Sequence, residues 1–404
     1  MSNAPSPITL CLYWQIVLLY SYFERRGMIE GLAVILFMIS AVCFFLLLYP
    51  YIVYPALLAR ASKQAIVPGE LNTTVSLLFC AFNESGSLDR KLQNLERLKA
   101  RRPDLEILVY DDASDDNTAN RLAERPELVV LVRGEERSGK AAGMKRLAAL
   151  ANGEILVFTD ANVLCAPDAI DRLLSYYVDP EIGGVCGTLL YEKGHLSPTA
   201  EIGADYWRLD ERLRTLESET GNVMGGDGSI FSIRRALYPQ FPDTVLDDFV
   251  VSMSVVFAGK RLVKAPDVLA YENSISSRSE EWRRKMRIGA RAYHTHAWMR
   301  PQLRRMNRLD RFKYVSRKTL RWFGGAFLAI GTVTALAALA LVSLPAFVLA
   351  LAGGGIGLAI ILRIKSGRLA KAGEIVLAMM ATLIGVLQGM RGYTVVIWSP
   401  ASSR

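Results

Sequence analysis

The chain has 404 residues, a formal net charge of +9 and a hydrophobic content of 51%, and its mean hydropathy is +0.22. This length is sufficient for one large domain or two ordinary ones, while the hydropathy is high for a soluble protein. Apolar blocks near both ends of the chain flank a polar middle. The composition therefore argues against an entirely soluble protein and favours a polar domain between membrane segments.

The N-terminal part contains two apolar stretches. Residues 1–28 hold an apolar run that is short for a spanning helix and is followed by "ERRG". We expect this segment to lie at the membrane interface, or to precede a true start at Met28. Residues 29–60 contain a longer uncharged run, which exceeds the about 20 residues that a spanning helix needs. We predict a transmembrane helix over 29–60.

The polar middle, residues 64–277, alternates between two kinds of pattern. Four short runs rich in aliphatic residues, "TVSLLFCAF", "LEILVY", "ELVVLV" and "GEILVFTD", are typical of buried strands. Amphipathic helical patterns separate them, and Ser138 is a possible N-cap for one of these helices. Strands that alternate with helices indicate a parallel sheet covered on both faces. We predict an α/β domain with a Rossmann-like, mostly parallel sheet.

Polar side chains follow three of the predicted strands where each strand ends. They are Asn83, Glu84, Asp111, Asp112 and Asp160. Adjacent carboxylates cost energy unless donors or a cation stabilise them, and ligands of open α/β sheets bind at the carboxyl ends of the strands. A solvated turn with a helix cap explains any one of these runs. Three such ends in one sheet favour a site for a nucleoside diphosphate.

A divalent cation would suit this edge of the sheet. Asp160 and Asn162 are two residues apart, and Mg²⁺ often takes one or two carboxylates together with substrate phosphates. Lys140 follows Gly139 at the start of a predicted helix, where it could bind a phosphate with the help of the helix N-terminus. A solvated surface lysine is the alternative. The five cysteines lack metal-ligand spacing, so no zinc site is expected.

Two acidic motifs lie further along the chain. "NVMGGDGSIFSIRR" places Gly226 and Asp227 in a glycine-rich turn, where the backbone can approach a ligand closely or simply form a hairpin. Asp247 and Asp248 lie at the head of a predicted helix. The helix dipole stabilises acidic side chains at this position, so a helix cap is the simplest interpretation. A carboxylate near an acceptor hydroxyl would instead serve as a general base.

The basic excess is concentrated in residues 278–321, where 15 Lys or Arg residues face three acids. Arg284, Arg287 and Arg291 are spaced for one helical face. This face could bind a diphosphate or lie on anionic lipid, and the local sequence does not separate the two. Because the segment precedes an apolar block, we predict basic amphipathic interfacial helices over 278–321 and expect no nucleic-acid partner.

The C-terminal part contains further apolar blocks. We predict transmembrane helices over 322–343, 345–363 and 374–398. The loop "RIKSGRLAK" and the residues just after the first span are basic. By the positive-inside bias, these segments and the α/β domain lie on the cytoplasmic side of the membrane.

Taken in order, these motifs resemble the family 2 glycosyltransferases, the membrane-bound inverting enzymes that include the cellulose, chitin and hyaluronan synthases. The resemblance covers about residues 74–293 and rests on "FCAFNES", "YDDASDDNT", "SGKAAGMKRLAALANGEILVFTDAN", "LDDF" and "RRKMRI". It implies a GT-A fold, a UDP-sugar donor and Mg²⁺ or Mn²⁺. It also implies a multi-pass protein of the bacterial inner membrane with a cytoplasmic catalytic domain.

The resemblance also implies roles for individual residues. Asp248 would be the catalytic base, with Asp247 beside it, and Asp160 with Asn162 would hold the metal. The donor-binding residues would be Asn83, Glu84, Asp111, Asp112, Lys140, Asp160, Arg284 and Arg287, and the acceptor side would be formed by Gly226 and Asp227. Two departures stand out, because Asn162 replaces an aspartate and residues 284–288 lack the Gln and Trp of the synthases.

The missing tryptophan and the small number of spans argue against a long extruded polymer. We therefore expect transfer of one or a few sugars to a lipid-linked or growing exopolysaccharide acceptor, with membrane lipids as further partners. One alternative is a processive polysaccharide synthase that also extrudes its product. A non-enzyme alternative is a catalytically silent membrane scaffold that binds anionic lipid through its basic helix.

Overall fold

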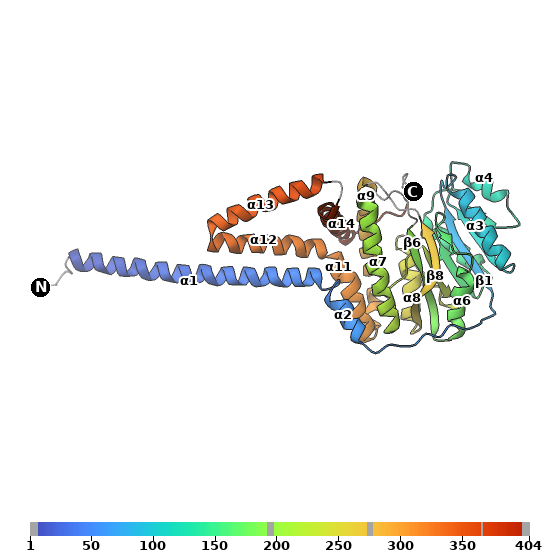
Figure 1. Ribbon diagram of the computed structural model, residues 1–404, viewed down its shortest axis with the longest axis horizontal. Helices are drawn as coiled ribbons and strands as arrows, with labels where there is room; N and C mark the ends of the chain where they lie inside the picture. Colours follow the sequence, from blue (N-terminus) through green and yellow to red (C-terminus); the bar gives the residue numbers. More distant parts are fainter. Residues whose placement is uncertain (1–6, 192–197, 273–277, 365–366, 398–404) are drawn as a thin grey trace.

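The computed structural model describes the backbone of residues 7–191, 198–272, 278–364 and 367–397 (Figure 1). An α/β domain lies at one end of the molecule, and long helices extend from it toward the N-terminus (Figure 1). Segments near the two ends of the chain contribute these long helices, and α1 packs against α12. The polar middle of the chain forms the α/β domain.

A mixed sheet of eight strands forms the centre of the α/β domain, in the order β3-β2-β1-β4-β7-β6-β8-β5. The strands are β1 (Val75–Ala81), β2 (Glu106–Asp111), β3 (Val130–Arg133), β4 (Ile155–Thr159), β5 (Leu164–Cys165), β6 (Ile182–Tyr191), β7 (Ile230–Arg234) and β8 (Arg261–Glu272). The four strands predicted from aliphatic runs are β1 to β4, and all their mutual pairings are parallel. β7 runs antiparallel between β4 and β6, so the second half of the sheet is mixed.

Helices cover both faces of this sheet. They are α3 (Leu88–Arg101), α4 (Thr118–Ala123), α5 (Lys140–Leu150), α6 (Ala169–Ser175), α7 (Pro198–Glu219), α8 (Asp247–Phe257) and α9 (Arg278–Arg305), with single 3₁₀ turns at Tyr176–Val178 and Arg235–Leu237. Side chains of β1 alternate between two cores: Leu77 and Phe79 pack with α3 and α6, whereas Leu78 packs with α5 and α8. This alternation follows from the two-residue period of a strand. The cap of α5 is Gly139 rather than the predicted Ser138.

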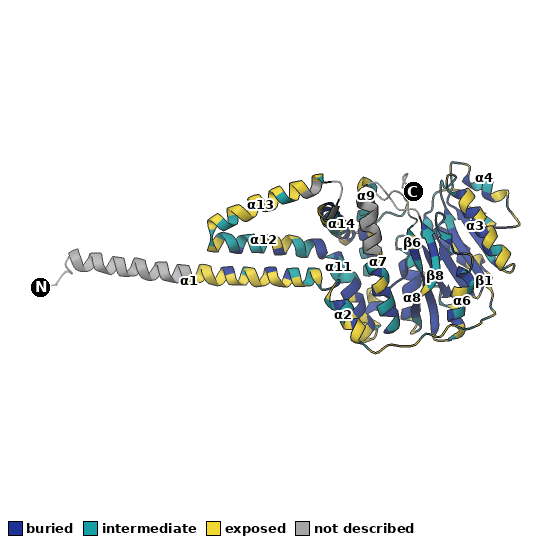
Figure 2. Ribbon diagram, viewed as in Figure 1, coloured by how far each residue is buried: buried dark blue, intermediate teal, exposed yellow. Residues whose placement is uncertain are grey.

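The remaining helices belong to the ends of the chain. They are α1 (Pro7–Leu48), α2 (Val53–Arg60), α10 (Arg308–Tyr314), a π-helical segment (Val315–Thr319), α11 (Leu320–Trp322), α12 (Gly324–Val342), α13 (Leu344–Arg363) and α14 (Gly367–Met390). Within the described residues, the segments Gly27–Leu48, Gly324–Val342 and Leu369–Met390 are long and apolar enough to cross a membrane. Figure 2 shows many exposed residues on α1 and α13 and mostly intermediate ones on α12, and Phe37, Val333 and Leu349 are among the exposed apolar residues of these helices. Exposed apolar faces of this extent suit contact with lipid or another apolar partner.

The N-terminal helices differ from the predicted pair of segments. α1 is one continuous helix through the "ERRG" run and ends at Leu48, so the span expected over 29–60 is shorter at its C-terminal end. Pro50 explains this end, because proline lacks an amide hydrogen and disfavours helical backbone in the residue before it. The following helix, α2, packs Tyr54 and Leu58 against Leu213 of α7. It therefore belongs to the interface between α1 and the α/β domain.

A buried network of ion pairs joins α7 to the segment before α12. Arg317 of the π-helical segment donates to Glu217 at 2.6 Å and to Asp210 at 2.9 Å, and Tyr54 of α2 donates to the same Glu217 at 2.6 Å. Arg321 adds a pair to Asp210 at 2.7 Å. This part of the predicted interfacial segment therefore lies inside the protein, because acids on α7 neutralise its arginines. The membrane-surface role remains a prediction for the exposed arginines at 300, 304, 305, 308 and 311.

We expect Arg317→Met to lower the free energy of unfolding by about 3–5 kcal/mol, because Glu217 loses its arginine partner and Asp210 loses one of its three. Thermal unfolding of the purified chain in detergent measures this loss. Arg311→Met is the matched control, since Arg311 is exposed on the adjacent α10, and its effect should stay within about 0.5 kcal/mol. Equal losses for the two variants would contradict a structural role for the network.

Candidate active site

A cavity of about 920 Å³ lies where the predicted strand ends meet α8, α9 and the long helices. Its wall includes Glu84 after β1, Asp112 after β2 and Lys140 at the start of α5. Asp160 after β4 and the acidic pair at the start of α8 complete this part of the wall. The carboxyl ends of parallel strands thus converge as the sequence predicts, and the cavity is large enough for a nucleotide-sized ligand.

Asp112 organises the loop that leads into α5. Its carboxylate accepts hydrogen bonds from the backbone amides of Ser138 at 2.8 Å and Gly139 at 3.1 Å, and it pairs with Arg137 at 3.1 Å. The guanidinium of Arg137 stacks 3.3 Å from the ring centroid of Phe82, and both side chains line the cavity. This flat, positively charged wall suits a nucleotide base or phosphate.

Two other residues predicted to bind the donor, Asn83 and Asp111, hold loops in place. Asn83 adopts a left-handed backbone conformation with φ of 53° and exchanges hydrogen bonds with Asp115 at 2.6 and 3.0 Å. Asp111 accepts from the hydroxyl of Ser114 at 2.5 Å. Neither Asn83 nor Asp111 belongs to the described cavity wall, so we assign them positioning roles instead of the predicted donor contact. Glu84 does line the cavity.

Lys140 lies among the carboxylates of the site. Its ammonium is 2.6 Å from Asp160 and 3.8 Å from Asp247. Burial alone would lower the pKa of Lys140, but the charges of Asp160, Asp247 and Asp248 outweigh burial and raise it above its usual range. Lys140 is therefore a permanent cation here, not the solvated surface lysine that was the alternative.

Gly228 leaves space for the Lys140–Asp160 ion pair directly beside the backbone. A Cβ at this position would lie 2.9 Å from the ammonium of Lys140 and 3.3 Å from the carboxylate of Asp160. Any side chain here would therefore displace the charged groups. The glycine in the turn after α7 thus lets the backbone lie close to the Lys140–Asp160 ion pair.

The metal ligands proposed from the sequence are few but compatible with Mg²⁺ or Mn²⁺. Asp160 lines the cavity and keeps 35% of its side-chain surface exposed, so it can supply a carboxylate oxygen. The amide nitrogen of Asn162 donates to Glu272 at 2.8 Å, which leaves its carbonyl oxygen as the second ligand. Within the described residues, no group of three or more His, Cys, Asp or Glu could hold a metal alone. An ion here would depend on donor phosphates, as is common for Mg²⁺.

Asp247 and Asp248 are the first two residues of α8, as predicted. Asp248 caps its own helix, since its carboxylate accepts from the amide of Phe249 at 2.7 Å. Burial and the neighbouring Asp247 raise the pKa of Asp248 to about 6. A carboxylate with a raised pKa in a cavity has the basicity that a general base needs.

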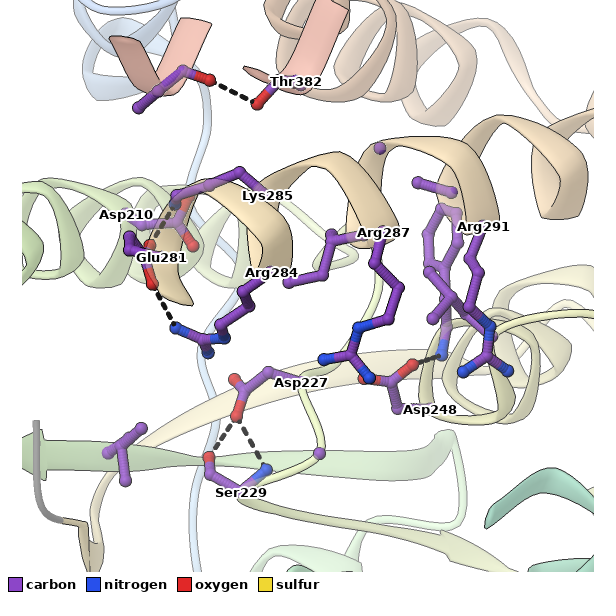
Figure 3. A pocket seen from close by; sticks show the side chains of 18 of the residues that line it. Asp210, Asp227, Ser229, Asp248, Glu281, Arg284, Lys285, Arg287, Arg291 and Thr382 are labelled. Carbon is purple, nitrogen blue, oxygen red and sulfur yellow. Dashed lines mark hydrogen bonds and ion pairs between the residues drawn. The ribbon is translucent and has the colours of Figure 1, made fainter. Parts of the chain in front are cut away.

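The arginines of α9 face the same site but differ in their contacts. Figure 3 shows Arg284 and Arg287 extending from α9 toward the segments that carry Asp227 and Asp248, and both arginines line the cavity. Arg291 instead donates to the carbonyl of Val245 at 2.6 Å, which fixes the loop before α8. Of the two alternatives for this helix face, the structure favours a cavity wall over the membrane surface.

Asp227 and Gly226 form the wall next to α7. Asp227 pairs with Arg214 and accepts from the amide of Ser229 at 3.1 Å. Although burial alone would raise the pKa of Asp227, Arg214 and these hydrogen bonds lower it. The amide of Gly226 donates to Ser252 of α8 at 2.8 Å. Asp227 is therefore a charged carboxylate fixed by Arg214 and Ser229, whereas Asp248 has a raised pKa.

Several cavity residues escaped the sequence analysis. They are Phe82, Arg137, Arg214, Gly228, Glu272 and Lys318. The position of Arg137, three residues before the predicted phosphate-binding Lys140, was a usable signal. Nothing local marks Arg214 or Lys318, because the contacts that bring them to the site come from distant segments.

A match to a family model agrees with this geometry. Residues 76–241 match the model "Glycosyl transferase family 2". An N-acetylglucosaminyltransferase of Azorhizobium caulinodans is 25% identical over 173 residues, which is 41% of this chain and 43% of that protein. A beta-monoglucosyldiacylglycerol synthase of Trichormus variabilis is 27% identical over 151 residues, 34% of this chain and 32% of that protein. The chain thus spans less than half the length of these curated relatives.

A solved structure extends the likeness beyond the matched region. The mannosyltransferase PcManGT from Pyrobaculum calidifontis, in complex with GDP-Man and Mn²⁺, aligns with a TM-score of 0.66. The alignment covers 89% of this chain and 99% of that chain at 23% sequence identity, which establishes a shared fold. Residues 76–241 therefore form a domain that matches the family 2 glycosyltransferases, and the α/β domain has the GT-A fold.

Proposed function

We propose that this protein is a membrane-bound inverting glycosyltransferase that moves a sugar from a UDP-sugar to a lipid-linked or growing polysaccharide acceptor. The cavity carries this proposal, because it joins a site for a nucleoside diphosphate to the long apolar helices. Asp112, Arg137 and Lys140 lie at the end formed by the sheet, while Leu48 and Ile52 come from the end of α1 and the turn after it. The relatives named above, which act on sugars and lipids, support the same class of reaction.

In the proposed reaction, the carboxylate of Asp248 takes a proton from an acceptor hydroxyl. The hydroxyl oxygen bonds to the anomeric carbon from the face opposite the diphosphate. The diphosphate leaves with the electron pair of the broken bond, so the configuration inverts. Lys140 and Arg287 stabilise the charge that develops on the leaving group.

Asp160 and Asn162 would hold Mg²⁺ or Mn²⁺ together with the donor phosphates, and the ion would offset the charge of the leaving diphosphate. Lys140 remains next to Asp160 and orients its carboxylate. Asn83 and Asp111 support the loops of the nucleotide wall rather than the nucleotide itself. Arg284 and Arg287 close the cavity from the side of α9.

A screen for nucleotide release tests the proposal. The purified chain is supplied with UDP-glucose, UDP-N-acetylglucosamine, UDP-galactose, UDP-glucuronic acid or GDP-mannose, together with Mg²⁺ or Mn²⁺ and membrane lipid extract. We expect one UDP-sugar to give acceptor-dependent UDP release and a product with one or a few added sugars. A ladder of long chains would favour the processive synthase, and no release under any condition would favour the scaffold.

We expect Asp248→Asn to lower kcat by about 10²- to 10⁴-fold, because the amide cannot accept the acceptor proton. Donor binding, measured by calorimetry with UDP, should be unchanged. Asp243→Asn is the matched control, since Asp243 pairs with Lys145 at the surface and should retain full activity. Full transfer by Asp248→Asn would move the role of base to Asp247.

The raised pKa of Asp248 predicts a pH dependence. Below about pH 6 the carboxylate is protonated and cannot act as a base, so kcat/KM should fall about tenfold for each further pH unit. Above about pH 7 the profile should be level, because Asp248 is then almost fully ionised. A profile of kcat/KM against pH measures this, and a half-maximal point near pH 4 would exclude a perturbed Asp248 as the base.

Gly228→Ala should disturb the Lys140–Asp160 pair without unfolding the domain. The new methyl group would displace only the end of a flexible side chain, so thermal stability should change little. We expect kcat/KM for the donor to fall by about tenfold or more, in line with one weakened charged hydrogen bond. Gly86→Ala is the control because a Cβ there meets nothing within 4 Å, and equal kinetics for both variants would contradict this role.

A further inference from the structure

The π-helical segment Val315–Thr319 places two adjacent cationic side chains in different environments. Arg317 enters the buried ion-pair network, whereas Lys318 lines the cavity. A π-helical turn adds a residue to the helix and shifts the side chains that follow, which is why such turns are frequent at functional sites. The segment lies immediately before α11 and α12, where the α/β domain meets the long helices.

The network around Lys318 is balanced without it. The ion pairs are Arg214 with Asp210 and Asp227, Lys264 with Glu211, Arg317 with Asp210 and Glu217, and Arg321 with Asp210. Four cations thus face four acids, and Lys318 is a fifth cation. No salt bridge within 4.0 Å among the residues described includes Lys318. One positive charge therefore remains at this end of the cavity.

Lys318 has a cavity on one side and an aromatic ring on the other. It lines the cavity, and its ammonium lies over the ring of Phe249, 4.8 Å from the ring centroid. Burial, together with Arg317 and Arg214, lowers the pKa of Lys318 to about 7 although Asp210 and Glu217 oppose this shift. A half-buried cation without an ion-pair partner is costly, and a bound anion would reduce that cost.

Apolar groups line the cavity beside this cation. Leu48 is the last residue of α1, and Tyr51 and Ile52 follow in the turn before α2. Trp322 of α11 lines the cavity as well. Since Gly27–Leu48 is long and apolar enough to cross a membrane, this part of the wall continues onto a candidate span. The cavity thus has an apolar wall from α1 and α11, and Lys318 lies on the same wall without an ion-pair partner among the described residues.

We propose that Lys318 binds the phosphate of the acceptor, and that the acceptor is a sugar carried on a lipid phosphate or diphosphate. This inference rests on the proposed function and names its acceptor class. The lipid chain lies against Leu48, Ile52 and Trp322, and the phosphate pairs with Lys318. A hydroxyl of the carried sugar then reaches Asp248, loses its proton there and bonds to the anomeric carbon as the nucleoside diphosphate leaves. A neutral glycolipid or a free glycan has no anion to pair with Lys318.

Binding of three probes to the purified full chain tests this assignment. Farnesyl diphosphate, farnesol and inorganic diphosphate are titrated by microscale thermophoresis with saturating UDP and Mg²⁺, so that the donor site is already filled. We expect farnesyl diphosphate to bind at least about tenfold more tightly than either farnesol or inorganic diphosphate, as one charged hydrogen bond and the apolar contacts require. Lys318→Met should remove the advantage over farnesol, and Lys318→Arg should retain most of it.

Lys260→Met serves as the control variant, because Lys260 pairs with Glu181 at the surface of the domain. Lys318→Met should also unfold at an equal or higher temperature than the native chain, since it removes an uncompensated charge. Unchanged binding of farnesyl diphosphate to Lys318→Met, equal binding of farnesol, or displacement of farnesyl diphosphate by UDP would each overturn the proposal. Because the assay measures binding alone, a chain that failed to release UDP from any donor would refute the proposed function without deciding the role of Lys318.

Discussion

The arrangement of the site depends on one lysine among three carboxylates. Lys140 lies next to Asp160 and Asp247, and Asp248 also raises its pKa. One positive charge among three negative charges leaves an excess of negative charge in a partly buried wall. Such a wall repels a diphosphate unless further cations accompany it. In the proposed reaction, the arginines of α9 and a divalent ion that arrives with the donor would meet this requirement, so donor binding would also balance the charge of the wall.

The same constraint explains why the two acids of α8 differ. Asp247 is 3.8 Å from the Lys140 ammonium, whereas the carboxylate of Asp248 accepts a hydrogen bond from the amide of Phe249. Burial and the charge of Asp247 raise the pKa of Asp248. Asp248 is therefore the better proton acceptor of the two. The sequence shows only two adjacent aspartates, whereas their contacts in the fold make them differ.

Much of the first half of the fold was predictable because its determinants are local. Aliphatic runs and amphipathic helices predicted β1 to β4, and polar residues at their ends predicted the edge where the site lies. The pairings of β7 join residues about 70 to 80 positions apart on β4 and about 45 to 50 positions apart on β6, and no local pattern encodes them. No local pattern marks Asp210 and Glu217 as buried, because only the tertiary fold brings Arg317 to them. For the same reason the basic segment was expected at the membrane surface, although part of it lies in the interior.

One part of the cavity carries an excess of negative charge and another part an excess of positive charge. This difference would orient a bound substrate. Carboxylates dominate around Lys140, where a donor with its cation would bind, and the network around Arg317 leaves Lys318 in excess beside the apolar residues of α1. A substrate with an anion at its lipid end and hydroxyl groups at its sugar end would bind in one orientation only, because reversal would place its phosphate against Asp247 and Asp248. Electrostatic repulsion between like charges thus selects the orientation in which a hydroxyl meets the base.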